Sequence, residues 1–327
     1  MANSCIKLGR TIIWNADDAA KKFIEQWFNA SPYIEAHTSG STGTPKIISL
    51  PKNDMKLSAL STCQKFSIGQ QSKMVMPLSA NYIAGKMMIV RAIVSGAELW
   101  IEEPSNNPLN QDYGTIDLIP IVPSQINSIL ASKYRHNIQN IIIGGGAIPP
   151  TTEIKCTSAN LNAYATYGMT ETCSHVAIRK IGETLYEAMP GISFSLDSRG
   201  CLIITAPQYS FKEITTNDIV TIIDSTHFEW IGRWDNVINT GGIKVFPEQI
   251  EQKISEIISD PFYIIGTPDE KWGECVTLYI ENPQVDINQL KYNIANHLNN
   301  KYERPTKIVA VAEFKRTYSG KIKREAL

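Results

Sequence analysis

Residues 38–46 have the sequence TSGSTGTPK, which concentrates hydroxyl groups, glycines and a lysine in one short segment. Glycine lets the backbone turn its amide groups toward an anion, while hydroxyl and ammonium groups donate hydrogen bonds to it. The segment therefore predicts a site for phosphate oxyanions. The side chains that we expect to contact the anion are Thr38, Ser39, Ser41, Thr42, Thr44 and Lys46.

The segment differs from a P-loop, in which the lysine directly follows the last glycine and precedes a serine or threonine. Here Thr44 and Pro45 separate Gly43 from Lys46. By composition alone, a stretch rich in serine, threonine and glycine would more often be a flexible surface loop. The rest of the chain has to decide between these interpretations.

Length and composition narrow the classes of protein. The chain has 327 residues, enough for two domains or for one large domain with an appendage. Its 31 basic and 32 acidic residues nearly cancel, so we expect no nucleic-acid partner. Six cysteines without a C-x-x-C pair favour a reduced, cytoplasmic protein. The N-terminus lacks an apolar signal segment and charges interrupt the apolar run 87–101, so we expect no membrane insertion.

Strand-like apolar segments alternate with helical patterns through the first two thirds of the chain. We expect strands at 74–78, 98–101, 118–122 and 140–143, and helices at 82–94 and 124–132. This alternation predicts an α/β fold in which crossover helices cover a largely parallel sheet.

After residue 200 the chain is richer in strand patterns, and short strands are expected at 201–205, 219–224 and 228–231. A helix is expected to begin at Pro247 and end near Asp260, because isoleucines recur there on one helical face. These features indicate a small C-terminal α+β unit. We place the boundary near Asp235, which divides the chain into domains 1–234 and 235–327.

Four further motifs follow the first segment in order. They are Gly144-Gly-Gly-Ala147, Tyr167-Gly-Met-Thr-Glu-Thr172, the stretch 232–251 and Ser319-Gly-Lys-Ile-Lys-Arg324. Together the five resemble the adenylate-forming, or AMP-binding, superfamily of acyl-CoA and aryl-CoA ligases, luciferases and carrier-protein adenylation domains. The resemblance runs from about residue 36 to the C-terminus. It implies a large N-terminal domain with mixed sheets and flanking helices, and a small mobile C-terminal α+β domain.

The resemblance assigns the first three motifs to ATP. The first segment would cover the phosphates, Thr170 would contact phosphate and Glu171 would bind Mg²⁺, for which one carboxylate with phosphate oxygens suffices. Taken alone, the glycines would indicate a turn after a strand, and Tyr167 a core residue. The residues assigned to adenine are Gly144, Gly145, Gly146, Ala147, Tyr167 and Gly168.

Further positions match the family around the domain boundary. Asp218 corresponds to the ribose-binding aspartate, although Asn217 replaces the usual glycine before it. Arg233 corresponds to an arginine that holds ribose or phosphate, and Asp235 to the hinge of the small domain. In isolation, Arg233 and Asp235 would indicate a surface ion pair of little energy.

Two C-terminal segments match catalytic loops of the family. Gly241, Gly242 and Lys244 resemble the loop used in thioester formation, where glycines let a narrow pantetheine arm pass. Lys321 matches the catalytic lysine, whose charge would stabilise the attack of a carboxylate on the α-phosphorus of ATP. The alternative interpretation of Lys321 is that it belongs to a mobile cationic tail.

These assignments imply an AMP-forming acid–thiol ligase that uses ATP, Mg²⁺ and CoA. A carboxylate would attack ATP to form an acyl-adenylate and release pyrophosphate, and the CoA thiol would then form a thioester and release AMP. The small domain would supply Lys321 for the first step and Gly241–Gly242 for the second. Rotation about Asp235 would exchange them.

The early position of the phosphate segment and the stretch 77–91 are most similar to one branch of the family, the o-succinylbenzoate–CoA ligases of menaquinone biosynthesis. The resemblance implies a small aromatic carboxylic acid as substrate. Asn81 and Tyr82 lie in the neighbourhood where this family often has a histidine, and Tyr82 is a candidate substrate contact. Lys86 and Arg91 are candidates for binding a second substrate carboxylate. A solvated helix face is the alternative for Lys86 and Arg91.

Other functions remain open at this point. The chain could be another acyl-CoA or aryl-CoA ligase, a carrier-protein adenylation enzyme, or a nucleotide-binding homologue without turnover. Retention of Glu171, Arg233, Asp235 and Lys321 speaks against the last of these. The sequence also leaves open whether the chain forms a homodimer.

Overall fold

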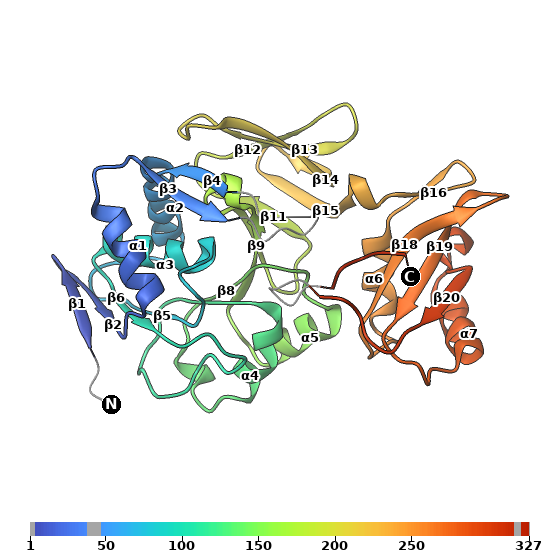
Figure 1. Cartoon of the computed structure of the whole chain (residues 1–327), viewed down its shortest axis with the longest axis horizontal. Helices are drawn as coiled ribbons and strands as arrows, with labels where there is room; N and C mark the ends of the chain where they lie inside the picture. Colours follow the sequence, from blue (N-terminus) through green and yellow to red (C-terminus); the bar gives the residue numbers. More distant parts are fainter. Residues whose placement is uncertain (1–3, 38–46, 317–321, 327) are drawn as a thin grey trace.

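The computed structural model describes residues 4–37, 47–316 and 322–326. They form a large α/β part followed by a smaller part, which Figure 1 draws in orange and red. Among the helices of these described ranges, none is long and apolar enough to cross a membrane. The α-helices are α1 (Asp18–Phe28), α2 (Lys52–Lys65), α3 (Ile83–Ser95), α4 (Ile126–Ala131), α5 (Pro150–Ser158), α6 (Pro247–Ile254) and α7 (Ile287–His297).

The N-terminal sheet has the strand order β1-β2-β6-β5. β1 and β2 are antiparallel, whereas β2 and β5 run parallel to β6. α3 connects β5 to β6, as expected for a parallel crossover. A separate hairpin consists of β3 and β4. The bounds are β1 (Cys5–Leu8), β2 (Thr11–Trp14), β3 (Tyr33–His37), β4 (Ile47–Pro51), β5 (Lys73–Met76) and β6 (Glu98–Ile101).

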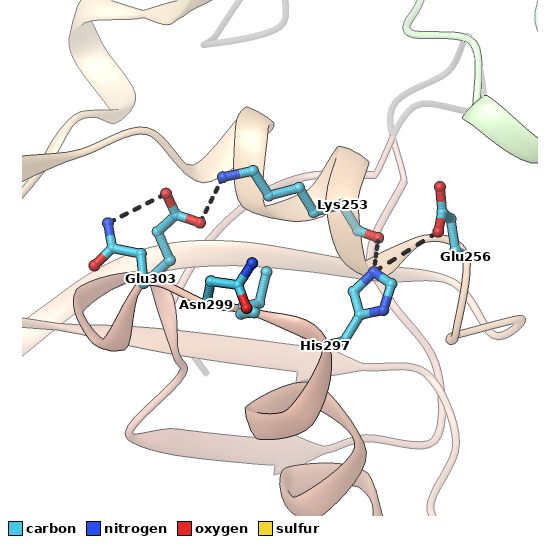
Figure 2. Close-up of a pocket in the computed structure, with 7 residues that line it drawn as sticks. Lys253, Glu256, His297, Asn299 and Glu303 are labelled. Atoms are coloured by element: carbon cyan, nitrogen blue, oxygen red, sulfur yellow. Dashed lines mark hydrogen bonds and ion pairs between the residues drawn. The ribbon is translucent and has the colours of Figure 1, made fainter.

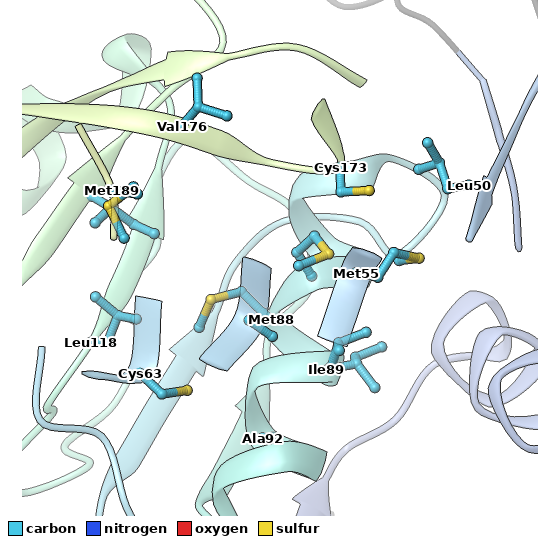
Figure 3. Close-up of a cluster of buried hydrophobic side chains, with 14 of the residues drawn as sticks. Leu50, Met55, Cys63, Met88, Ile89, Ala92, Leu118, Cys173, Val176 and Met189 are labelled. Carbon is cyan, nitrogen blue, oxygen red and sulfur yellow. The ribbon is translucent and has the colours of Figure 1, made fainter. Parts of the chain in front are cut away.

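Helix α3 confirms the helix predicted at 82–94 and forms the centre of the large core. It ends at Gly96, whose φ of +75° is the left-handed conformation that glycine adopts without strain. Figure 3 shows Met88 and Ile89 of α3 in a buried cluster with Met55 of α2 and Cys173. Segments far apart in sequence therefore meet on α3.

The second sheet has the strand order β12-β13-β14-β15-β11-β10-β9-β8-β7. Its strands at 140–143 and 201–205 were expected and are confirmed as β8 and β13, whereas β14 begins earlier than predicted. The bounds are β7 (Ile119–Ile121), β8 (Ile141–Ile143), β9 (Ala163–Gly168), β10 (His175–Lys180), β11 (Leu185–Ala188), β12 (Ser193–Leu196), β13 (Cys201–Ala206), β14 (Lys212–Asp224) and β15 (His227–Arg233).

The prediction of a largely parallel sheet is wrong for this second sheet. Only β7, β8 and β9 are parallel neighbours, and the pairs from β9 to β12 are antiparallel. After β9 the strands follow one another without an intervening α-helix. Parallel neighbours need a long crossover, so short connections produce antiparallel pairs.

The smaller part contains a sheet with the order β17-β16-β19-β18, and β20 lies parallel to β19. α6 begins at Pro247 as predicted but ends at Ile254, before Asp260. The turn that follows still buries Ile258, which explains the longer apolar pattern. The strands are β16 (Ile238–Thr240), β17 (Ile243–Val245), β18 (Phe262–Asp269), β19 (Gly273–Ile280) and β20 (Lys307–Ala310).

The buried apolar side chains of the described residues fall into clusters that separate between Trp230 and Ile238. Two clusters and the residues packed on them use positions up to Trp230, and two others use positions from Ile238 onward. Separate cores are typical of separate folding units. The gap between the two groups of clusters contains Asp235, the proposed domain boundary.

Asp54 of α2 provides a test of how the large part is held together. Its carboxylate is 1% exposed and accepts hydrogen bonds from the Ser210 backbone N–H and hydroxyl group at 2.9–3.1 Å. We expect Asp54→Ala to lower the free energy of unfolding by about 2 kcal/mol, because the Ser210 donors, which are only partly buried, lose their charged acceptor. Ser210→Ala, which keeps the backbone bond, should cost less. Urea unfolding measures both, and equal midpoints for wild type and Asp54→Ala would contradict the expectation.

Candidate active site

Strands β3 and β4 flank residues 38–46, the predicted phosphate-binding segment, in the sequence. His37 at the end of β3 pairs with Ile47 at the start of β4. β4 also packs near the 3₁₀ turn Thr170–Thr172, although the two are far apart in sequence. The predicted phosphate contacts Thr38, Ser39, Ser41, Thr42, Thr44 and Lys46 lie outside the described residues.

Thr170 and Glu171 lie on that 3₁₀ turn. The hydroxyl of Thr172 closes the turn by accepting from the Met169 N–H at 3.0 Å and donating to the Ser174 carbonyl at 2.7 Å. Cys173 follows with a φ of +63°, which is unusual for a residue other than glycine. The turn leaves Glu171 exposed to solvent.

The glycine motif and Tyr167 reach the same edge of the second sheet. β8 and β9 are parallel neighbours, so the turn after Ile143 and the end of β9 lie side by side. Gly145 has a φ of +86°, a left-handed conformation that suits glycine. Gly145, Gly146 and Ala147 are exposed, and Gly144 is half-buried. A flat ring could therefore approach this backbone.

Tyr167 and Asp218 are in direct contact. The Tyr167 hydroxyl donates to the Asp218 carboxylate at 2.7 Å, and the Trp230 indole donates to the same carboxylate at 3.2 Å. The Tyr167 ring packs edge-on against Phe228, with centroids 5.1 Å apart. Burial, followed by the nearby Asp218 charge, raises the pKa of Tyr167, which keeps its hydroxyl protonated as a donor.

Arg233 joins this group through the pairing of β14 with β15. Asp218 and Arg233 face each other in register, and their side chains lie 3.9 Å apart. Arg233 also donates to Asp235 at 3.0 Å, and Asn217 donates to Asp235 at 3.2 Å. Asn217, which replaces the usual glycine, therefore contacts Asp235, the residue predicted to be the hinge.

Trp230 and Arg199 belong to this region but were missed by sequence reasoning. Arg199 donates to the side chain of Asn217 at 3.0 Å, and its guanidinium lies over the Trp234 ring. No motif marks either residue. Their positions follow from strand pairing, which a single sequence does not reveal.

The glycines of the predicted thioester loop form the turn between β16 and β17. Gly241 and Gly242 have φ values of +60° and +82°, as required in a two-residue hairpin turn. The Gly241 N–H donates to the Trp272 carbonyl at 2.8 Å. The ammonium group of Lys244 lies 4.7 Å from the centroid of the Trp234 ring, and Trp234 directly precedes Asp235 in the sequence. Lys321, the predicted catalytic lysine, lies outside the described residues.

The two candidates for a second substrate carboxylate are not brought together. Lys86 is 8% exposed and lies 5.0 Å from the Phe23 ring of α1, where burial lowers its pKa. Arg91 is 2% exposed and donates to Ser174 at 2.8 Å. Five helical positions rotate a side chain by about 140°, so the two diverge. Both are buried, so the alternative of a solvated face is wrong, whereas Tyr82 at the start of α3 is exposed.

A hollow of about 250 Å³ lies elsewhere, on the smaller part (Figure 2). Its charged groups are mostly paired with each other. Lys253 contacts Glu303 at 2.6 Å, and His297 lies 3.0 Å from the Lys253 carbonyl. None of the described residues lining it is a predicted site residue.

A divalent ion fits the predicted site through Glu171. The described residues contain no cluster of three or more histidine, cysteine or acidic side chains that could hold a metal. Mg²⁺ does not require one, because it commonly takes one or two carboxylates, water and phosphate oxygens. An exposed carboxylate on a turn that packs near β4 suits that donor set.

The sequence pattern of the AMP-binding enzyme family matches residues 12–197. A 2-succinylbenzoate–CoA ligase from Listeria monocytogenes is 24% identical over 336 aligned positions, which cover 94% of this chain and 72% of the relative. Among solved structures, an acyl-CoA synthetase (AMP-forming)/AMP-acid ligase II-like protein from Dyadobacter fermentans is 34% identical, with a TM-score of 0.62, and covers 94% and 91% of the two chains.

A second solved structure shares the fold at lower identity. It is the O-succinylbenzoate coenzyme A synthetase from Bacillus subtilis, solved with ATP and magnesium. Its TM-score is 0.77 at 20% identity, over 89% of this chain and 68% of that one.

The contact between Tyr167 and Asp218 gives a test of the site. We expect Tyr167→Phe to keep the ring packing but weaken AMP binding about fivefold, because Asp218 loses a donor worth about 1 kcal/mol. Tyr167→Ala, which also removes the ring, should weaken binding further. Isothermal titration with AMP measures both, and wild-type affinity in both variants would exclude Tyr167 from the nucleotide site.

Proposed function

This chain belongs to the AMP-binding enzyme family, and on that basis we propose that it is an AMP-forming acid–thiol ligase using ATP, Mg²⁺ and CoA. The observation that carries the proposal is the meeting of Tyr167, Asp218 and Arg233 at one end of the second sheet. These residues come from separate motifs and are all assigned to the nucleotide. The name of the Listeria relative favours o-succinylbenzoate as the substrate. We propose that this chain converts it to its CoA thioester for menaquinone biosynthesis.

In the first half-reaction a carboxylate oxygen attacks the α-phosphorus of ATP, and the bond to pyrophosphate breaks. We assign adenine to the exposed turn 144–147 and the Tyr167 ring, and ribose to Asp218 and Arg233. Mg²⁺, held by Glu171 and phosphate oxygens, would neutralise triphosphate charge. Thr170 and the segment 38–46 would position the phosphates, and Lys321 would stabilise charge on the attacking and transferred groups.

In the second half-reaction the CoA thiol attacks the acyl carbonyl, loses its proton and displaces AMP. We assign the hairpin turn Gly241–Gly242 and Lys244 to the path of the pantetheine arm. Lys321 and this turn both belong to the unit 235–327, so rotation of that unit against 1–234 about Asp235 would exchange them. The separate cores on the two sides of Asp235 support such a movement.

Arg91 is the better candidate for recognising a second carboxylate of an aromatic diacid. It is buried, its Nε has no hydrogen-bond partner in the described part of the chain, and it contacts Ser174 and Met88 rather than a carboxylate. A buried guanidinium of this kind favours an acidic ligand. Lys86 faces α1 instead. Tyr82, which is exposed and directly precedes α3, stays a candidate substrate contact.

The cell compartment and the assembly are further parts of the proposal. All six cysteines are free thiols and five are buried, which fits the reducing cytoplasm. A homodimer remains an alternative to a monomer, and sedimentation analysis distinguishes the two.

The proposal predicts a defined product. Incubation with o-succinylbenzoate, ATP, Mg²⁺ and CoA should yield o-succinylbenzoyl-CoA and AMP, detected by mass spectrometry. Benzoate should react far less, because it lacks the second carboxylate. Product from other acids alone would indicate another acyl-CoA or aryl-CoA ligase, and product only with a carrier protein would indicate an adenylation enzyme. ATP binding without turnover of any acid would contradict the enzymatic proposal.

The two half-reactions can be separated at Lys321. Lys321→Ala should lower acid-dependent ATP–pyrophosphate exchange by about 100-fold, because a charge acting at the transferred phosphate is lost. The same variant should convert supplied acyl-adenylate to thioester at close to the wild-type rate. Lys323→Ala is the matched control and should retain both activities. Equal losses of both half-reactions in Lys321→Ala would remove it from the adenylation step.

A further inference from the structure

Two carboxylates on one face of α6 form a mostly buried acidic pair. Glu248 and Glu251 are three positions apart, and their side chains are only 10% and 16% exposed. Like charges at this spacing repel each other. Burial, offset by Arg324 and increased again by Glu248, raises the pKa of Glu251 to about 7. Both carboxylates therefore need a positive partner.

Arg324 is that partner, and it comes from the C-terminal segment. Its guanidinium donates to Glu251 at 2.7 Å and lies 3.9 Å from Glu248. The other oxygen of Glu251 accepts from the backbone N–H of Ile264 at 2.7 Å. One arginine thus compensates two carboxylates that would otherwise be buried without a described cation.

The same C-terminal segment is attached to the smaller part at further points. The Lys323 N–H donates to the Lys315 carbonyl, and the Tyr263 hydroxyl donates to the Glu325 carbonyl, both at 2.8 Å. On the preceding side, Arg316 makes two hydrogen bonds to the Glu281 carboxylate. The chain is therefore held on both sides of the stretch 317–321.

Glu248 also reaches the other way, toward the hinge. Its Oε1 accepts from the Asn236 side chain at 2.5 Å, directly after Asp235. Its Oε2 lies so near Gly232 of β15 that a Cβ atom on that glycine would be 2.7 Å away. The Glu248 carboxylate of α6 therefore lies against both the last strand of the large part and Asn236 beside the proposed hinge.

We propose that Arg324 is a positioning residue that couples the C-terminal segment to the hinge through Glu248 and Glu251. Lys321 precedes Arg324 by three residues, so the coupling would make the placement of that lysine depend on the orientation of the hinge. Arg324 itself touches no reacting atom in this scheme. The consequence for adenylation rests on the proposed function, whereas the coupling is a property of the fold.

Hydrogen exchange followed by mass spectrometry tests the coupling without any reference to activity. In Arg324→Gln, amides of the peptides covering 314–326 and 232–240 should exchange about tenfold faster than in wild type, because the attachment of the segment and the neutralisation of Glu248 are both lost. Lys323→Gln, which removes a neighbouring charge without touching α6, is the matched control and should leave both peptides unchanged. Unchanged exchange in Arg324→Gln, or faster exchange in the 314–326 peptide alone, would overturn the coupling.

The half-reactions then test its consequence. Arg324→Gln should lower ATP–pyrophosphate exchange by about tenfold, as expected for a misplaced catalytic group. In this variant, the rate of thioester formation from supplied acyl-adenylate should stay within about twofold of the wild-type rate. Arg324→Lys should recover most of the ATP–pyrophosphate exchange activity. Equal losses of both half-reactions together with a lower thermal midpoint would mean a structural role only and would overturn the positioning role.

A double-mutant cycle shows whether the pair itself is responsible. If Arg324 acts through Glu251, the variant Arg324→Gln/Glu251→Gln should exchange ATP and pyrophosphate no more slowly than Arg324→Gln alone. Additive losses would contradict action through Glu251. A wild-type protein inactive with every acid would instead remove the proposed function, and hydrogen exchange would still decide the coupling.

Discussion

The candidate site depends on the hydrogen bonds that satisfy the nearly buried carboxylate of Asp218. A carboxylate at 6% exposure is costly unless hydrogen-bond donors surround it. Its donors are the Tyr167 hydroxyl from β9 and the Trp230 indole from β15, with Arg233 nearby. Satisfying this one group fixes how β9 faces the hairpin of β14 and β15. The positions assigned to adenine and ribose are thereby held side by side.

The same principle recurs at other buried carboxylates. Asp54 of α2 is met by Ser210, and the pair Glu248 and Glu251 is met by Arg324. In both cases the partners are distant in sequence. Apolar packing builds the separate cores, but apolar contacts have no preferred direction and do not by themselves fix how segments are oriented. Charged groups that need a particular partner define how segments are placed, and beside Asp235 the Glu248 carboxylate of α6 meets Asn236 and lies near Gly232 of β15.

The success of sequence reasoning differed among elements for identifiable reasons. α3 and the strands β6, β8 and β13 were predictable because apolar periodicity and glycine punctuation are local properties. The parallel character of the second sheet was overestimated, because strand direction depends on the connections between neighbours. Lys86 and Arg91 were both candidates for binding a second substrate carboxylate, yet helical geometry sends them toward α1 and Ser174. Trp230 and Arg199 carried no local signal at all.

What the sequence determined by itself is the chemistry and its order along the chain. Short motifs such as Tyr167 to Thr172 carry family membership because their backbone conformation and side-chain types are set within a few residues. Only the tertiary structure decided which of these groups meet. Tyr167 of β9 reaches Asp218 of β14 although β10, β11 and β15 lie between these strands in the sheet order, and Arg324 reaches Glu251 across 73 positions. Such contacts depend on the compensation of buried charge in three dimensions, which no local pattern records.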